Sequence, residues 1–142
     1  MKKPVKSSEN LQPIQRSERE GNPMNTRRLG EKGEDFAVEY LKRKNYRILC
    51  RNYRAGKLGE IDLIAVKDNR IIFAEVKTRT GDIFGTPAEA VSYKKQKTIK
   101  KVASCFLKEY NMSDCEISFD VIEVIMTKDY RPVNINHIEE AF

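Results

Sequence analysis

The chain has 142 residues, of which 39% are hydrophobic and 34% charged, as expected for one small globular domain. Three scattered cysteines, one histidine and no apolar run of about 20 residues argue against a disulfide framework, a zinc site and a membrane span, which favours a cytoplasmic protein without membrane contact. The net charge is +6, but residues 1–28 hold seven basic and three acidic residues, so a nucleic-acid partner must be argued from local clusters.

The first predicted element is a helix that follows a tail. Residues 1–27 are rich in Ser, Glu, Asn, Gln, Pro and Arg and show no apolar period. This composition predicts a disordered basic extension before a folded domain at residues 28–142. From Gly30 to Lys44 the apolar residues recur at helical spacing, and Asn45 is expected to end the helix.

Strands are expected next. Period-2 alternation and turn residues place them at Tyr46–Arg54, Glu60–Val66 and Arg70–Thr78. The connection at residues 67–69 is short, so the second and third strands are expected to form a tight antiparallel hairpin.

The second half of the chain predicts a loop, a helix and further strands. Breaker residues fill 81–87, and a helical stripe then runs over Ala88–Tyr110, with a break near Ser92 left open. Ile117–Met126 reads as a fourth strand and Val133–Ile138 as a short fifth. The order α-β-β-β-α-β predicts an α/β fold, a sheet with helices packed on it.

Charged side chains interrupt the apolar faces of the hairpin strands. Glu75 and Lys77 continue the face of Ile71 and Phe73. Pairing centred on the hairpin turn places residues whose numbers sum to about 137 opposite each other, so Asp62 is expected to face Glu75. Two facing carboxylates repel unless a cation lies between them, and Mg²⁺ prefers oxygen ligands. The alternatives are an ion pair at a strand end and a solvated aspartate.

Polar residues also border the apolar stripes of both helices. Glu34 is either a capping or surface residue of the first helix or a further metal ligand. Gln96 lies on the core-facing stripe of the long helix and is either exposed and self-capping or directed at the strand ends. Around it lies a basic cluster that is either a solvated face or a phosphate-binding surface: Lys94, Lys95, Lys97, Lys100 and Lys101.

Taken together, these residues resemble a known nuclease signature. Asp62, followed after a hairpin by Glu75-Val-Lys77, resembles the PD-(D/E)xK pattern, with Ile61 in place of its proline. The chain also resembles the YraN family, small bacterial proteins related to archaeal Holliday junction resolvases. The matching segments are Leu29-Gly-Glu-Lys-Gly-Glu34, Gly59-Glu-Ile-Asp-Leu-Ile-Ala65, Phe73-Ala-Glu-Val-Lys-Thr-Arg79, Phe84-Gly-Thr-Pro-Ala-Glu-Ala90 and His137-Ile-Glu-Glu-Ala-Phe142.

The resemblance implies a restriction-endonuclease-like three-layer fold, in which helices flank a mixed central sheet. It also implies a defined active-site set: Glu34, Asp62, Glu75, Lys77 and Gln96. Mg²⁺ or Mn²⁺ would be held by Asp62, Glu75 and the carbonyl of Val76, with Glu34 as a further ligand. Lys77 would act on the attacking water, and Gln96 would position water or phosphate. Arg79 and the five lysines of the basic cluster would bind the DNA backbone.

The function expected from these residues is Mg²⁺-dependent cleavage of DNA. The substrate would be recognised by structure rather than sequence, with branched DNA of repair or recombination as the candidate. By analogy with junction-cutting relatives, a homodimer is expected. The alternatives are a nucleic-acid-binding module that no longer cuts and a structural protein with a buried ion-pair network.

Overall fold

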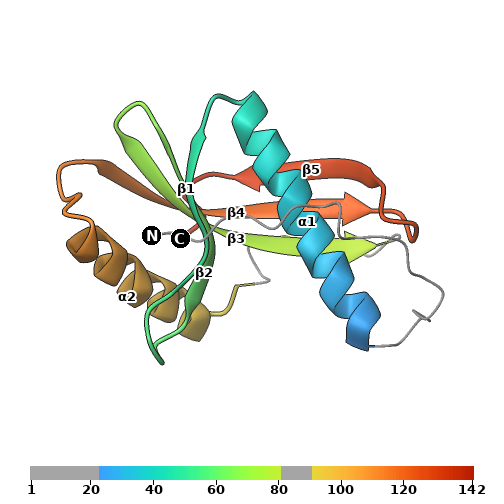
Figure 1. Ribbon diagram of the computed structural model, residues 1–142, viewed down its shortest axis with the longest axis horizontal. Helices are drawn as coiled ribbons and strands as arrows, with labels where there is room; N and C mark the ends of the chain where they lie inside the picture. Colours follow the sequence, from blue (N-terminus) through green and yellow to red (C-terminus); the bar gives the residue numbers. More distant parts are fainter. Residues whose placement is uncertain (1–22, 81–90) are drawn as a thin grey trace.

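The structure is an α/β arrangement, shown in Figure 1. The computed structural model describes residues 23–80 and 91–142. Within these ranges the elements are α1 (Pro23–Arg43), β1 (Arg47–Arg54), β2 (Glu60–Lys67), β3 (Arg70–Thr80), α2 (Tyr93–Glu109), β4 (Glu116–Met126) and β5 (Pro132–Ile138). The predicted α/β class and element order are confirmed, and the short strand predicted near the C-terminus is present as β5.

The described strands form one mixed sheet in the order β1-β2-β3-β4-β5. Strands β3 and β4 run parallel, and the other neighbours are antiparallel. A parallel pair needs a long crossover, and α2 lies in that connection. Strand β3 is therefore central, and its residues 71–75 are buried. Its regular pairing with β2 ends at Ala74, whereas its pairing with β4 continues to Thr80.

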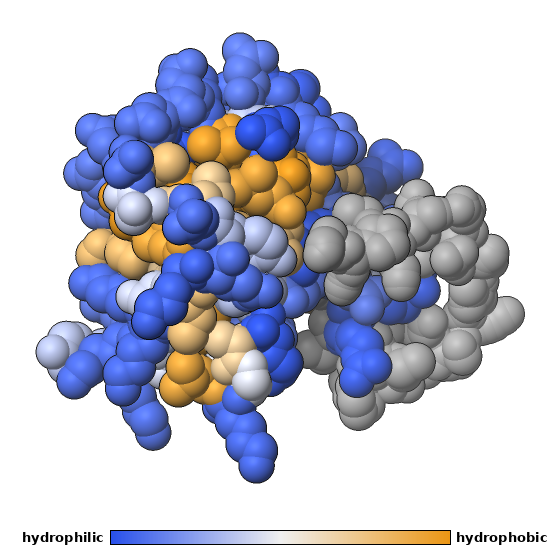
Figure 2. All heavy atoms as spheres, turned by 60° about the vertical axis from the view of Figure 1, so that its left-hand side comes forward, coloured by the Kyte–Doolittle hydropathy of each residue, from blue (hydrophilic) through white to orange (hydrophobic). Residues whose placement is uncertain are grey.

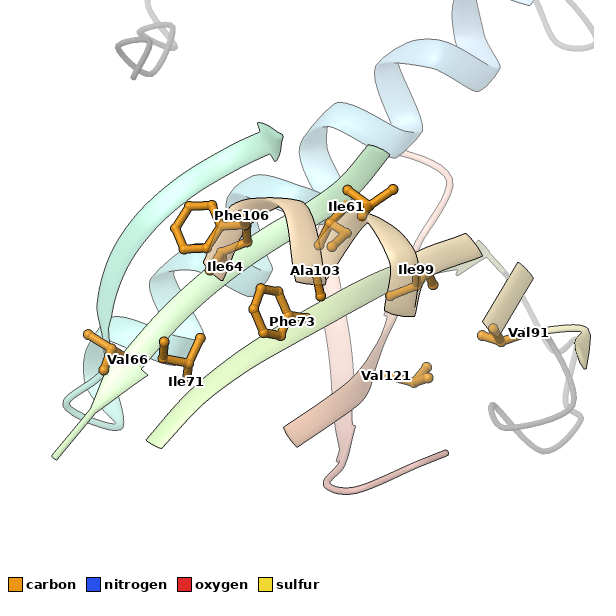
Figure 3. Close-up of a cluster of buried hydrophobic side chains, with 11 residues drawn as sticks. Ile61, Ile64, Val66, Ile71, Phe73, Val91, Ile99, Ala103, Phe106 and Val121 are labelled. Carbon is orange, nitrogen blue, oxygen red and sulfur yellow. The ribbon is translucent and has the colours of Figure 1, made fainter. Parts of the chain in front are cut away.

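The two helices cover opposite faces of the sheet. The apolar side of α1, with Ala37, Val38 and Leu41, packs on a cluster that includes residues of β2, β3 and β4. On the other face, Figure 3 shows Ile99, Ala103 and Phe106 of α2 over the hairpin strands. The sheet is thus the middle of three layers, as predicted.

Helix α1 begins seven residues before the predicted position. The expected start was Gly30, but the helix runs from Pro23. Proline suits a first helical position because its missing N–H would have no intrahelical partner there. Residues 23–27, which were assigned to the disordered extension, are therefore helical. The rest of that extension, residues 1–22, lies outside the described residues.

Helix α2 begins directly after Ser92, where the sequence analysis left a break open. The expected start was Ala88, whereas the helix starts at Tyr93. The Ser92 hydroxyl accepts a hydrogen bond from the Lys95 N–H at 3.1 Å and so caps the N-terminus. The predicted loop at 81–87 and the predicted first turn of the helix at 88–90 lie outside the described residues.

A buried polar network fastens α1 to the far edge of the sheet. Asp120, which is fully buried in β4, accepts hydrogen bonds from Ser118 Oγ at 2.5 Å and from the Glu140 N–H at 3.2 Å. Its second oxygen lies 2.7 Å from His137 Nε2, and His137 Nδ1 lies 3.1 Å from the Tyr40 hydroxyl. The network joins α1, β4, β5 and the C-terminal segment, which fixes the position of α1 over the sheet.

The face of the molecule drawn in Figure 2 combines hydrophilic and apolar areas. Figure 2, which brings the α2 side of Figure 1 forward, shows polar residues around a central apolar area. In the described parts of the chain, no helix is long and apolar enough to cross a bilayer.

Candidate active site

The β2–β3 hairpin brings Asp62 and Glu75 together. Residues from Lys67↔Arg70 to Leu63↔Ala74 pair in the predicted register, and the next step of this register places Asp62 opposite Glu75. The regular pairing stops before Asp62, whose Oδ2 accepts a hydrogen bond from the Val76 N–H at 2.8 Å. The register of the hairpin is therefore confirmed, and the Asp62 carboxylate is fixed against the main chain of β3.

Burial and the negative charge of Glu75 perturb the pKa of Asp62. Desolvation and then the charge of Glu75 raise the pKa of Asp62 to about 7, while the Val76 hydrogen bond and the charge of Lys95 oppose the shift. The charge of Glu34 adds to the rise. A carboxyl group with this pKa takes up a proton near neutral pH unless another cation neutralises the site.

Two lysines approach the Glu75 carboxylate, which is buried. Lys95 Nζ of α2 lies 3.3 Å from Glu75 Oε2, and Lys77 Nζ of β3 lies 3.8 Å from the same atom. The proximity of Lys77 follows from its position two residues along one strand face. The Lys95 contact was not anticipated from the sequence, which placed Lys95 among the phosphate-binding residues. Its N-terminal position in α2 directs it toward the hairpin.

Glu34 reaches the neighbourhood of the site because α1 crosses β3 closely. Gly33 is buried, and a Cβ at this position would overlap Thr78 Oγ1. The Glu34 carboxylate lies 3.5 Å from Arg51 Nη2 and accepts a hydrogen bond from Asn52 Nδ2 at 3.3 Å. Burial raises the pKa of Glu34, and the contacts with Asn52 and Arg51 oppose this rise. Glu34 is thus close enough to influence Asp62 but is held by β1.

Gln96 makes a capping contact. Its Nε2 donates to the Val91 carbonyl at 3.0 Å, while its own N–H donates to the Ser92 carbonyl at 2.8 Å. Among the described residues, the Gln96 side chain has no hydrogen bond with Glu75 or Lys77. The structure therefore gives Gln96 the self-capping contact that the sequence analysis left open, and its role toward water or phosphate stays a prediction.

The basic cluster predicted on α2 divides into three parts. Lys95 lies in the site, Lys97 Nζ is 5.3 Å from the centre of the Tyr93 ring, and Lys100 Nζ is 5.6 Å from that of Phe119. Lys94 and Lys101 are exposed. The cluster therefore lies on an exposed helix face that carries at least two aromatic contacts, and its binding of phosphate stays a prediction.

Arg79, near the end of β3, forms an ion pair with Glu123 of β4. Its Nε lies 2.6 Å from Glu123 Oε2, an ion pair whose N–H direction does not make a hydrogen bond. Glu123 was missed by the sequence analysis, although a signal was present. It is the one acid between four apolar residues of β4, Val121-Ile-Glu-Val-Ile125.

The oxygen donors near the site are few. In residues 23–80 and 91–142, no group of three or more His, Cys, Asp or Glu side chains is arranged to hold a metal ion. Asp62 and Glu75 form a pair, whereas Glu34 is turned to Arg51 and Asn52. Two carboxylates still suffice for Mg²⁺, which usually keeps several water ligands and is bound by one or two carboxylates.

Comparison with known proteins identifies relatives over most of the chain. A family model described as "Uncharacterised protein family UPF0102" matches residues 33–124, a range that contains every predicted site residue from Glu34 to Lys101. A UPF0102 protein of Alkaliphilus oremlandii is 50% identical over 119 residues, which cover 82% of this chain and 98% of the relative. UPF0102 proteins of Caldicellulosiruptor saccharolyticus and Clostridioides difficile are each 47% identical over 119 residues, covering 84% of this chain and 100% of the relative. The YraN-like relationship expected from the sequence motifs is confirmed.

Proposed function

This chain belongs to the UPF0102 family, and we propose that it is a divalent-metal-dependent endonuclease that hydrolyses phosphodiester bonds in DNA. The observation that carries the proposal is the convergence of Asp62 and Glu75 from neighbouring strands, with Lys77 Nζ 3.8 Å from Glu75. A protein that only binds nucleic acid has no need for a buried glutamate and a half-buried aspartate where phosphate would approach. A metal-dependent hydrolase would use the two acids to hold the ion and the lysine to offset charge on the phosphate.

The acids of the site suit a hard cation. A half-buried aspartate whose pKa is raised by desolvation and by a neighbouring glutamate is stabilised when a divalent ion replaces the proton. Asp62, Glu75 and the carbonyl of Val76 would hold Mg²⁺ or Mn²⁺, with Glu34 contributing through water because Arg51 and Asn52 already contact it. When bound, the ion polarises the phosphoryl oxygen and lowers the pKa of bound water.

The remaining residues would act on water and phosphate. Lys77, whose side chain is one-third exposed, would orient the attacking water and offset the charge that develops on the phosphoryl group. Lys95 would turn from Glu75 to the phosphate once a cation neutralises that carboxylate. Gln96 would position water through its carbonyl oxygen, because its amide nitrogen donates to Val91.

Binding would depend on the DNA backbone. The exposed lysines of α2 and Arg79 offer positive charge without a base-reading element, so recognition would follow the shape of the DNA rather than its sequence. We propose branched DNA as the substrate. Symmetric cleavage of a four-way junction requires two active sites, so the functional unit would be a homodimer.

The alternative is a nucleic-acid-binding module that keeps the fold without cutting. It is favoured by the contacts of Lys95 with Glu75 and of Gln96 with Val91, since both side chains already have partners. The two proposals differ in whether Mg²⁺ converts bound DNA into product.

Cleavage assays separate the two functions. Labelled four-way junction, duplex and single-stranded DNA are incubated with the protein in EDTA, Mg²⁺ or Mn²⁺. We expect metal-dependent cleavage of the junction by the wild type, and binding without cleavage by the Asp62→Asn and Lys77→Ala variants. Binding without cleavage by the wild type in both metals would favour the alternative.

A further inference from the structure

A second acid is buried on the active-site face of the sheet. Glu123 is only 3% exposed and pairs in parallel register with Lys77, so its side chain shares the face of Glu75 and Lys77. Burial of a carboxylate in an apolar strand is unfavourable unless charged or hydrogen-bonding partners compensate for lost water. The partners of Glu123 therefore indicate why the acid is there.

Three strands meet at the Glu123 carboxylate. Its Oε2 lies 2.6 Å from Arg79 Nε of β3, and its Oε1 accepts a hydrogen bond from Asn136 Nδ2 of β5 at 3.1 Å. The Arg79 side chain keeps 20% of its surface exposed. Among the described residues, the two terminal nitrogens of Arg79 form no hydrogen bond. Glu123 thus forms a close ion pair with the guanidinium without a hydrogen bond to Nε, and no described residue is hydrogen-bonded to the terminal nitrogens.

An ion pair of this kind contributes little to stability by itself, because two charges lose water to form it. The pair instead keeps the Arg79 guanidinium beside Glu123, and the remaining N–H groups of this planar donor suit the oxygens of a phosphate. Arg79 lies two residues beyond Lys77 on the same face of β3, a separation of about 6.6 Å along a strand. Neighbouring phosphates of a nucleic-acid strand are separated by a similar distance.

From this geometry we propose that Arg79 binds the backbone phosphate next to the scissile one, and that Glu123 and Asn136 are positioning residues for it. The inference rests on the proposed function and adds a defined phosphate subsite to it. A strand would lie along the C-terminal half of β3, with one phosphate at Lys77 and the next at Arg79. This subsite carries no base contact, so it contributes affinity and register without sequence preference.

The effect of Glu123→Gln on DNA affinity distinguishes a positioning role of Glu123 from a simple charge effect. This variant removes a negative charge beside the DNA, so simple electrostatics would tighten binding. If Glu123 positions Arg79, the same variant weakens binding although the protein becomes more positive. We measure the dissociation constant of labelled DNA duplex in EDTA over a series of salt concentrations. Loss of one phosphate contact should reduce the slope of log affinity against log salt by about 0.9 for duplex DNA.

We expect Arg79→Gln and Glu123→Gln to reduce the slope by similar amounts. The double variant should be no weaker than Arg79→Gln alone. Asn136→Ala should also weaken DNA binding and reduce the salt slope. Because Asn136 is exposed, this variant provides the test if Glu123→Gln folds poorly. Thermal melts without DNA report folding. The control is Glu140→Gln, which removes the acid of an exposed pair with Arg70 at 3.1 Å and should leave the slope unchanged.

The outcomes separate this inference from the proposed function. Wild-type affinity, or tighter binding, in folded Glu123→Gln and Asn136→Ala would overturn the positioning role, and metal-dependent cleavage by the wild type would still stand. A reduced salt slope in the Arg79 and Glu123 variants would support the subsite, even if the wild type cuts no DNA in Mg²⁺ or Mn²⁺.

Discussion

At the scale of single residues, the interactions of Asp62 have opposing effects on its pKa. Its carboxylate accepts the Val76 N–H, which favours the charged form, while burial and Glu75 favour the protonated form. The net effect raises the pKa of Asp62 from 3.8 to about 7. The folded protein therefore binds this proton more tightly than the unfolded chain, and the free energy of unfolding falls as pH rises between these two values.

Replacement of Asp62 by Asn should remove this pH dependence. Asn keeps an oxygen that can accept the Val76 N–H but has no charge to repel Glu75. In EDTA, we expect Asp62→Asn to equal or exceed the wild type in stability near pH 8. The wild type should gain on the variant as pH falls toward 4. Urea denaturation midpoints measured across this pH range report the difference.

The effect of Mg²⁺ on thermal stability tests whether Asp62 holds a metal ion. Mg²⁺ should stabilise the wild type by mass action and leave Asp62→Asn unaffected, whereas Lys77→Ala should still respond to the ion. If Asp62→Asn melts several degrees below the wild type in EDTA and the wild type ignores both metals, the carboxylate pair is structural.

At the scale of elements, the approach of α1 to β3 sets the position of Glu34. A Cβ at position 33 would overlap Thr78 Oγ1, so a methyl group in place of the Gly33 hydrogen would require the helix or the strand to move. We expect Gly33→Ala to lower stability by about 1–3 kcal/mol, the usual cost of overpacking. Gly30→Ala in the same helix is the matched control, since a Cβ there meets no atom within 4 Å. It should be neutral or stabilising by about 1 kcal/mol because alanine favours helix.

Chemical denaturation measures both glycine variants. Equal stabilities for Gly33→Ala and Gly30→Ala would contradict the close helix–strand contact. Cleavage by Gly33→Ala should also fall if the position of Glu34 matters to the site.

At the scale of the whole molecule, the distribution of charge matters more than its sum. The net charge is +6, but the exposed face of α2 concentrates lysines near the carboxylate pair. Lys94 and Lys101 are exposed members of this cluster. If they contact backbone phosphates, Lys94→Gln with Lys101→Gln should weaken binding equally for all sequences. The salt slope should fall by about 0.9 for each lost duplex contact.

A charge-matched variant controls for the loss of net charge. Lys42→Gln with Arg43→Gln removes two charges from the last turn of α1. Binding isotherms in several salt concentrations compare the two double variants. Equal slopes in the wild type and the α2 variant would identify the lysine cluster as a solvated face only.

Sequence by itself determined the parts of this protein that depend on short-range geometry. The alternation of the strands and the short turn at residues 68–69 set the hairpin register, and this register placed Asp62 beside Glu75. The position of Lys77 followed from the same alternation. These relations need only the pleat of a strand and the length of a turn. The family relationship also followed from motifs in the sequence.

Only the tertiary structure decided which partner each polar side chain has. The contact of Lys95 with Glu75 depends on where α2 begins, and that of Glu34 with Arg51 depends on how α1 crosses the sheet. The ion pair of Arg79 with Glu123 requires the parallel register of β3 and β4. Each of these contacts joins residues that are 17 or more positions apart and lie on different elements. The periodicity of a single helix or strand does not predict contacts between different elements, because these contacts are set by the packing of the helices on the sheet and by the pairing of the strands.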